Sequence, residues 1–234
     1  MAVTPLDYLP RVNPPEEYVG PPTDPEDERI EVGVVIVGGG PAGLACAIRL
    51  MQLLENEPAL AESLGEVPVA LVEKGKNTGS HLMSGAMMDP SAMRKLFPDL
   101  DESDWPTYGP VEKDQLVFMT RKRSVQLHGG PLPVPPPFRN HGNHVTSIAQ
   151  LGRFLGEKAE EMGVYILPET NAYKLLVEDG VVRGVRTGDK GRGKDGEPLR
   201  NFEPGTDVVA SAYSRSTTKP IETRSCPVFA FFIG

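Results

Sequence analysis

The sequence is poor in cysteine and has no long apolar segment. Its two cysteines, Cys46 and Cys226, lie far apart, and neither belongs to a Cys-x-x-Cys pair. This distribution argues against a disulfide framework and against a cysteine-ligated metal centre, and it favours a reducing compartment. No run approaches the roughly 20 apolar residues that span a bilayer. Peripheral attachment to a membrane stays open, because it needs only an apolar surface.

Targeting signals and excess positive charge are also lacking. The N-terminus has neither the charged start and apolar core of a signal peptide nor the arginine content of a mitochondrial presequence. The formal net charge is -8. Acidity of this size argues against a nucleic-acid partner, since phosphate binding needs a basic surface. The absent presequence favours a bacterial protein.

Residues 1–29 form a leader that contains seven prolines and many acidic side chains. Proline fixes φ and removes backbone donors, so this stretch is predicted to be an extended arm. Its composition also suits a disordered leader. We therefore place the first domain boundary between residues 29 and 30.

The pattern changes sharply after the leader. Val32 to Val37 suits one buried parallel strand, Leu44 to Leu54 predicts a helix, and Val67 to Val72 is a second apolar strand. Residues 55–66, between the helix and the second strand, are predicted to be a polar connection. Together these elements make a βαβ unit, which is right-handed in a parallel sheet. The predicted fold class is α/β, with a Rossmann-like FAD/NAD(P)-binding domain and an inserted β-rich segment.

The turn between the first strand and the helix carries a dinucleotide fingerprint, Gly38-x-Gly40-x-x-Gly43. Gly38 permits the tight turn, Gly40 lets the backbone approach a pyrophosphate, and Gly43 lets the helix pack closely on the strand. The pyrophosphate is expected at the helix N-terminus, where free N–H groups and the helix dipole favour negative charge. A lone glycine triplet also occurs in α/β turns that bind nothing. Here the flanking strand and helix supply the context that the motif requires.

Glu73 ends the second strand and is the predicted ribose ligand, with its carboxylate accepting from the adenosine hydroxyls. It lies 30 positions after Gly43, whereas the usual spacing is about 20. The polar connection accounts for the excess as an insertion after the helix. An acid at this place disfavours a 2′-phosphate, so NADP is not expected. The fingerprint alone does not separate FAD from NAD.

The rest of the chain predicts short helices and strands. Asp89-Pro90 is typical of a helix start, and that helix should end before Pro98. A second helix is predicted from Ser147 to a stop at Gly163. The remaining predictions are strands within 110–127, a stiff connector over 131–137, a strand over 164–167, a hairpin over 173–187 that turns at Asp179-Gly180, and a loop over 188–205.

Four blocks of the sequence resemble a known family. They are VVIVGGGPAGLACAIRL from Val34, VALVEKG from Val69, GSHLMSGAMMDP from Gly79 and NHGNHV from Asn140. These blocks resemble electron-transfer flavoprotein:ubiquinone oxidoreductase, and the similarity continues to about residue 210. Many flavoproteins share the fingerprint, whereas the GSHLMSGAMMDP and NHGN blocks are specific. The resemblance implies that residues 30–210 form the N-terminal part of an FAD-binding domain.

The resemblance also implies how FAD lies. Its diphosphate would sit on Gly38–Gly43, its adenosine ribose on Glu73, and Gly79–Gly85 would approach the flavin. His141 is the polar residue to test near the flavin, whereas a structural or exposed role is expected for His128 and His144. The predicted cofactor-binding residues are Gly38, Gly39, Gly40, Pro41, Ala42, Gly43, Glu73, Lys74, Gly79, Ser80, His81, Ser84, Gly85 and His141.

The implied reaction passes electrons from reduced electron-transfer flavoprotein to ubiquinone through the flavin and a [4Fe-4S] cluster. Because the isoalloxazine does the redox chemistry, no catalytic residue and no metal ligand are nominated. The family's segment corresponding to Thr78–Asp99 associates with the membrane, which implies a peripheral protein at the cytoplasmic face of the bacterial inner membrane, or a cytoplasmic one. Its apolar side chains could equally fill a core. They are Leu82, Met83, Met87, Met88, Met93, Leu96 and Phe97.

The resemblance stops after residue 210. The family's quinone region and its four cluster cysteines have no counterpart here, and two isolated cysteines do not supply four thiolate ligands. We interpret residues 211–234 as the product of truncation or a frameshift, with Val228–Ile233 as an aggregation-prone end. Because the parallel sheet would lack its later strands, we predict a fold that is incomplete at its C-terminus, with marginal stability and weak or no FAD retention.

Two alternatives accompany the enzyme hypothesis. One is a non-enzymatic, truncated FAD-binding module with no electron path to quinone, which the missing cysteines favour. The other is a geranylgeranyl-reductase-type flavoprotein, which shares the fold and the fingerprint. The GSHLMSGA and NHGN blocks favour the quinone oxidoreductase over the reductase.

Overall fold

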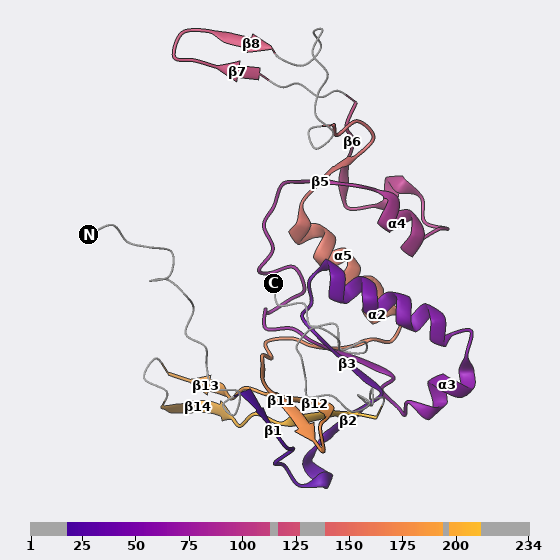
Figure 1. The fold of residues 1–234 in the computed structure, drawn as a ribbon, viewed down its shortest axis with the longest axis vertical. Helices are drawn as coiled ribbons and strands as arrows, with labels where there is room; N and C mark the ends of the chain where they lie inside the picture. Colours follow the sequence, from indigo (N-terminus) through magenta and orange to yellow (C-terminus); the bar gives the residue numbers. More distant parts are fainter. Residues whose placement is uncertain (1–17, 113–116, 127–138, 194–196, 212–234) are drawn as a thin grey trace.

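The structure is a computed structural model that describes residues 18–112, 117–126, 139–193 and 197–211. Two sheets form the body of the molecule, and smaller antiparallel elements extend from it (Figure 1). Within these ranges no helix is both long and apolar enough to cross a bilayer. Some predictions fall on residues outside the described part of the chain: the leader over 1–17, His128, the connector over 131–137 and the tail over 212–234.

The first sheet contains the βαβ unit, as the sequence predicts. Its three parallel strands have the order β10-β4-β3, and they are β3 (Val34–Val37), β4 (Val69–Val72) and β10 (Tyr165–Leu167). Two helices, α2 (Pro41–Leu54) and the short α3 (Pro58–Ser63), connect β3 to β4. All residues of β4 are buried, as expected for a central strand that is covered on both faces.

Helix α5 (Ile148–Glu161) packs beside α2 on one face of this sheet (Figure 1). Its buried residues Leu151, Leu155 and Ala159 recur every fourth position, which gives the helix one apolar side. They join Leu44 and Leu71 in a core between the helices and the sheet. The helix ends at the predicted stop, because Gly163 takes a positive φ of 88°.

A second, five-stranded sheet covers the other face of the parallel sheet. Its order is β1-β11-β12-β15-β2, with β1 (Val19–Gly20), β2 (Ile30–Val32), β11 (Ala172–Glu178), β12 (Val181–Thr187) and β15 (Asp207–Ala210). Val35 and Val72 of the first sheet meet Val185 and Val208 of the second in a separate buried cluster. The predicted hairpin is confirmed as β11–β12.

Residues 18–29 depart from the predicted extended leader, because they pack on the five-stranded sheet. Strand β1 pairs in parallel with β11, and a 3-10 turn, η2 (Glu26–Glu28), precedes β2. Arg186 Nη1 lies 2.7 Å from Asp24 Oδ1 and 2.7 Å from Asp207 Oδ1. The fully buried Asp207 also accepts from the backbone N–H of Thr23 at 2.6 Å and of Asp24 at 2.9 Å.

A small antiparallel sheet lies beyond α5, with the order β5-β9-β6. Its strands and flanking helices are β5 (Ala86–Met88), α4 (Ser91–Leu96), η3 (Glu102–Asp104), β6 (Thr107–Pro110) and β9 (His144–Thr146). The buried His144 contacts Thr107 Oγ1 through Nδ1 at 3.1 Å and Glu102 Oε2 through Nε2 at 3.3 Å. These contacts agree with the structural role predicted for this histidine.

Two further hairpins lie outside the body. The strands predicted within 110–127 include β7 (Val117–Met119) and β8 (Ser124–Gln126), which pair with each other and project from the end of the molecule (Figure 1). The predicted loop over 188–205 is wrong, because β13 (Lys190–Arg192) and β14 (Pro198–Glu203) pair there. Arg192, which stacks on Phe202 and pairs with Asp189, stabilises the second hairpin.

Three boundaries also differ from prediction. The run from Val32 to Val37 is divided between β2 of one sheet and β3 of the other. The chain passes from one to the other at Gly33, where a Cβ would lie 2.5 Å from the Pro68 carbonyl oxygen. The polar connection over 55–66 contains α3. Helix α4 begins at Ser91 rather than at Pro90, although Asp89 Oδ1 accepts from Ser91 N–H at 2.8 Å and supports its start.

Candidate dinucleotide-binding site

The fingerprint glycines form the turn from β3 into α2. Gly38 has a φ of 103°, which side-chain-bearing residues rarely adopt, and its N–H donates to the Val72 carbonyl at 2.8 Å. A Cβ at Gly43 would lie 2.1 Å from the Gly38 carbonyl oxygen, so the first turn of α2 packs directly on the turn. Both positions therefore need glycine for the local fold, as the sequence predicts.

The fold itself does not require glycine at position 40. Gly40 is the N-cap of α2, with an ordinary φ of -77°, and a Cβ placed there meets nothing within 4 Å. The first N–H groups of any helix have no partner inside the helix. Gly40 therefore leaves open space beside a set of free donors and the positive end of a helix dipole, which suits a phosphate group.

Glu73 lies where β4 ends, next to the fingerprint. Its Oε2 accepts from Gly39 N–H at 2.7 Å, and its Oε1 accepts from Gly75 N–H at 2.5 Å. The side chain is 12% exposed, and His81 Nδ1 lies 3.7 Å from Oε1. A carboxylate has roughly four acceptor positions. Two backbone donors thus fix this one in place and leave capacity for ligand hydroxyls.

The segment after Glu73 contains most of the other predicted site residues. Gly79 is buried, whereas Lys74, Ser80, His81, Ser84 and Gly85 are exposed. The exposed His81 reaches back to Glu73, and Ser80 Oγ accepts from Asn77 N–H at 3.1 Å. The structure therefore brings Gly39, Glu73, Gly75 and His81 together at one edge of the parallel sheet.

His141 lies in a different part of the molecule. It is an exposed residue in the turn before β9, where Asn143 N–H donates to the Asn140 carbonyl at 2.9 Å. The antiparallel register pairs Ala86 with Thr146 and Met88 with His144. Gly85 and the turn that holds His141 are therefore at opposite ends of the small sheet. A flavin contact for His141 stays a prediction that this arrangement does not support.

The segment over 78–99 divides into buried and exposed apolar residues. Met93 and Leu96 belong to the core, which is the alternative that the sequence left open. Met83 is 83% exposed and Met87 is 49% exposed. Only part of this segment is therefore available for a membrane contact.

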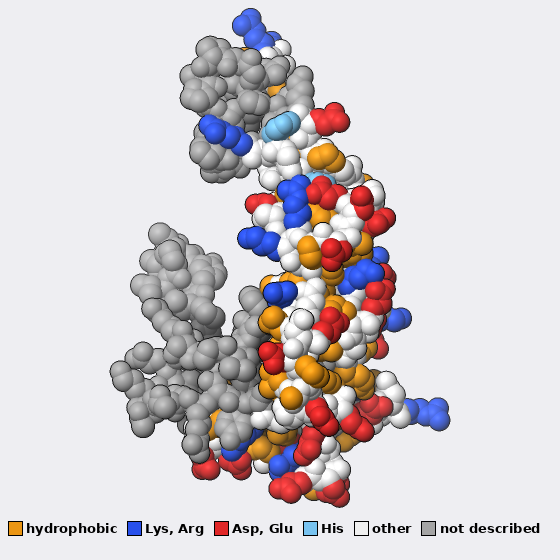
Figure 2. Space-filling model, turned by 90° about the vertical axis from the view of Figure 1, so that its right-hand side faces the viewer, with side chains coloured by type: hydrophobic (Ala, Val, Ile, Leu, Met, Phe, Trp, Pro, Cys, Tyr) orange, Lys and Arg blue, Asp and Glu red, His pale blue; other side chains and the backbone are white. Residues whose placement is uncertain are grey.

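Sequence reasoning missed the apolar character of the β7–β8 hairpin. Phe118 and Met119 are 58% and 76% exposed, and Val125 is also exposed. The turn between the strands carries Arg121, Lys122 and Arg123. Three adjacent basic residues between the apolar run Val117-Phe118-Met119 and Val125 are the signal that could have revealed it. Figure 2 shows Lys and Arg side chains at this end of the molecule, and basic and acidic side chains mixed along the rest of the same face.

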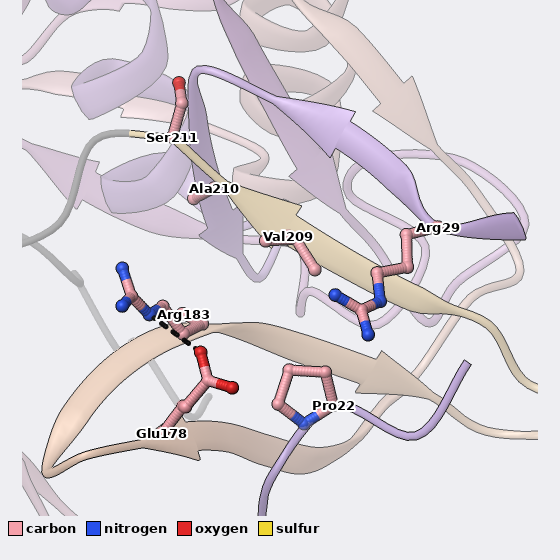
Figure 3. A pocket seen from close by; sticks show the side chains of 7 residues that line it. All are labelled: Pro22, Arg29, Glu178, Arg183, Val209, Ala210 and Ser211. Carbon is pink, nitrogen blue, oxygen red and sulfur yellow. Dashed lines mark ion pairs between the residues drawn. The ribbon is translucent and has the colours of Figure 1, made fainter. Parts of the chain in front are cut away.

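A hollow of about 260 Å³ lies on the five-stranded sheet (Figure 3). Its lining includes Arg29 and Arg183, and Arg183 Nε lies 3.5 Å from Glu178 Oε2. None of the predicted cofactor-binding residues lines it, and its lining residues are Pro22, Arg29, Glu178, Arg183, Val209, Ala210 and Ser211.

No protein-family model matches the chain. It is 42% identical over 186 residues to the probable electron transfer flavoprotein-ubiquinone oxidoreductase of Acinetobacter baylyi, a match that covers 79% of this chain and 32% of that protein. It is 41% identical over 191 residues to the mitochondrial electron transfer flavoprotein-ubiquinone oxidoreductase of Dictyostelium discoideum, a match that covers 81% of this chain and 29% of that protein. The human mitochondrial protein of that name is 41% identical over 183 residues, which cover 77% of this chain and 28% of the human protein. The chain thus spans about a third of the length of these curated relatives.

A solved structure also resembles this one. The geranylgeranyl bacteriochlorophyll reductase-like protein of Thermoplasma acidophilum has a TM-score of 0.49 and 18% identity, over 78% of this chain and 38% of that one. A similarity of this size decides nothing about the reaction.

Proposed function

We propose that this chain, which is homologous over 79% of its length to the N-terminal part of an electron transfer flavoprotein-ubiquinone oxidoreductase, binds FAD. The observation that carries the proposal is the pair of contacts from Gly39 N–H and Gly75 N–H to the Glu73 carboxylate, beside the open N-cap at Gly40. These residues fit the group, because they offer a diphosphate site and a ribose acceptor side by side. Gly38–Gly43 would hold the diphosphate, and Glu73 would hold the ribose.

We further propose that the chain contributes this FAD site to an oxidoreductase that takes electrons from electron transfer flavoprotein and delivers them to ubiquinone. The names of the relatives support the donor, the acceptor and the reaction class. FAD itself supplies the electron-carrying chemistry, so the protein's task is to bind, orient and shield it. We assign no acid, base or nucleophile to this chain.

The first test is FAD binding by the purified chain. We expect the chain to take up added FAD at about one per chain, with a shifted flavin absorption spectrum. Retention during gel filtration should be weak, because the described parallel sheet has only three strands. Release of the bound flavin and its identification by HPLC separates FAD from FMN and from NAD. A colourless chain that takes up no FAD, yet melts cooperatively, would refute the proposal.

We also propose that the β7–β8 hairpin contacts an anionic membrane surface, such as the cytoplasmic face of a bacterial inner membrane. The hairpin stands away from the body in the described part of the chain (Figure 1), and Phe118, Met119 and Val125 are exposed on it. Apolar side chains that insert at the headgroup level, next to basic residues that attract anionic lipids, are the features of a peripheral anchor. The basic turn supplies that charge locally, although the chain as a whole is acidic.

Vesicle sedimentation tests this contact. Substituting Phe118→Ser together with Met119→Ser should abolish binding to vesicles rich in phosphatidylglycerol without lowering the melting temperature, because both residues are exposed. Changing Arg121, Lys122 and Arg123 to Gln should weaken binding roughly 100-fold, at about 1 kcal/mol for each basic residue. It should also remove the salt dependence of the binding.

Met83→Ser with Met87→Ser is the matched control for the hairpin variants, since these are exposed methionines of the segment over 78–99. If this control loses vesicle binding while the hairpin variants bind fully, the membrane contact would be assigned to the segment over 78–99 and not to the hairpin.

A further inference from the structure

The loop after Glu73 lies against α5 with no room between their backbones. A Cβ at Gly152 would lie 2.9 Å from Gly79 Cα, and a Cβ at Gly79 would lie 2.5 Å from the Ala149 carbonyl oxygen. One turn further along α5, a Cβ at Gly156 would lie 2.2 Å from Thr78 Oγ1. Thr78 and both helix glycines are buried. Thr78 and Gly79 therefore fit against α5 only because Gly152 and Gly156 have no side chain.

The same loop determines how the Glu73 carboxylate is held. Gly75, at its start, donates to Oε1, and His81, at its end, lies 3.7 Å from that oxygen. The loop also closes on itself, since Ser80 N–H donates to the Asn77 carbonyl at 3.1 Å. A shift of Thr78 and Gly79 away from α5 would consequently move the groups that fix Oε1. Oε2, which is held by Gly39, would be disturbed less.

We propose that Gly152 and Gly156 are positioning residues that set the orientation of the ribose-binding carboxylate through Thr78 and Gly79. Neither glycine touches the carboxylate, and both act through the loop. The inference rests on the proposed FAD site, and it adds α5 to the elements that define that site. Glycine is otherwise unfavourable inside a helix, where alanine is the best helix former. Two glycines one turn apart in the middle of α5 therefore have a packing reason.

Alanine substitution separates this role from general stability. In Gly156→Ala, the intrinsic helix preference favours the variant, while the new methyl group pushes Thr78 outward. We expect FAD binding to weaken roughly tenfold, which corresponds to about 1.4 kcal/mol. We expect no comparable fall in the melting temperature of the FAD-free chain. Gln150→Ala, at an exposed position of the same helix, is the control and should bind FAD like the parent.

A second substitution tests the contact itself. The methyl group of Gly156→Ala collides with Thr78 Oγ1 at 2.2 Å and meets Thr78 Cβ at 3.0 Å. Thr78→Ala removes the first contact and leaves the second, which a shift of a few tenths of an ångström relieves, so the double variant should recover most of the lost affinity. Gly152→Ala meets backbone atoms of Gly79, and truncation of Thr78 should not rescue it. If Gly156→Ala fails to fold, the double variant still decides the question. Near-parental FAD affinity of the double variant supports the proposal, and a double variant that folds but does not recover FAD affinity overturns it.

A measurement without cofactor distinguishes this proposal from the FAD assignment. Amide hydrogen exchange of Gly75 should speed up at least tenfold in Gly156→Ala and return to the parental rate in the double variant, while exchange in the β4 strand stays unchanged. This result would hold even if the parent bound no FAD, in which case the FAD assignment alone would fail. Unchanged exchange at Gly75, or unchanged FAD affinity in a variant of a parent that does bind FAD, would overturn the positioning role.

Discussion

Replacing Gly40 with alanine is expected to weaken FAD binding strongly while leaving the folded chain almost unchanged. A Cβ at this position meets no protein atom within 4 Å, and its φ of -77° suits any residue. The methyl group would instead occupy the space proposed for the pyrophosphate. Because overpacking costs about 1–3 kcal/mol, the affinity should fall roughly 10- to 100-fold. The change of an N-cap residue should lower stability by at most about 1 kcal/mol. Equilibrium titration with FAD and thermal unfolding of the FAD-free chain measure the two effects.

Gly43→Ala is the matched comparison, and the opposite pattern is expected. Its methyl group would collide with the Gly38 carbonyl oxygen, so stability itself should fall, by about 3 kcal/mol. FAD loss would then follow from a distorted turn. If Gly40→Ala bound FAD like the parent, the space beside Gly40 would not be the diphosphate site.

Replacing Asp207 with asparagine is expected to cause the second large effect, a loss of stability without direct contact to the cofactor site. Asp207 is fully buried and accepts from Thr23 N–H, Asp24 N–H and Arg186 Nη1. The asparagine amide would place its own N–H donor against one of these three donors, so that hydrogen bond would be lost. The free energy of unfolding should fall by about 3 kcal/mol, the lower end for breaking a buried ion pair, because Arg186 is partly exposed. Urea unfolding measures the change, and Glu31→Gln, an exposed acid on β2, is the control.

The same carboxylate makes stability depend on pH. Burial alone raises the pKa of Asp207, but the N–H bonds from Asp24 and Thr23 and the Arg186 guanidinium outweigh it, so the pKa lies below its ordinary value. A carboxyl group of this kind stabilises the fold fully above its unfolded pKa of about 3.9, and the contribution is lost as the pH falls through the folded pKa. The difference in stability between the parent and Asp207→Asn should therefore shrink below about pH 4. A difference that stays constant down to pH 2 would contradict the assignment.

Local patterns in the sequence predicted the elements whose partners are close in the chain. The fingerprint and its flanking apolar runs located β3, α2 and β4, and helical spacing located α5. Asp179-Gly180 located the β11–β12 turn, where both residues adopt a positive φ. Glu73 was assigned from its place at the end of a strand, and the structure puts it beside Gly39.

The missed features depend on residues far away in the chain. Residues 18–29 have a leader's composition, and their ties to the sheet come from distant residues: β11 pairs with β1, and Arg186 and Asp207 bind Asp24. Gly33 looks like one residue of a continuous apolar run until Pro68 and Leu64 are placed against it. The contact between Gly156 and Thr78 joins positions 78 residues apart, which no local pattern encodes. The flavin contact of His141 stays a prediction drawn from its sequence block, and the register of β5 and β9 places its turn at the end of the small sheet opposite Gly85.

The pairing of β2 with β15 also sets an order of events during synthesis. Ile30 pairs with Val208, which follows it by 178 residues. At about 5–20 residues per second, a ribosome adds that stretch in roughly 10–35 seconds. The βαβ unit can form from the nascent chain early, but β1 and β2 must wait for the hairpin and for β15. Contacts at such separations slow folding, because loop closure costs entropy before pairing compensates for it. Strands β1 and β2 are thus made well before the strands with which they pair, and they are among the last to find their places.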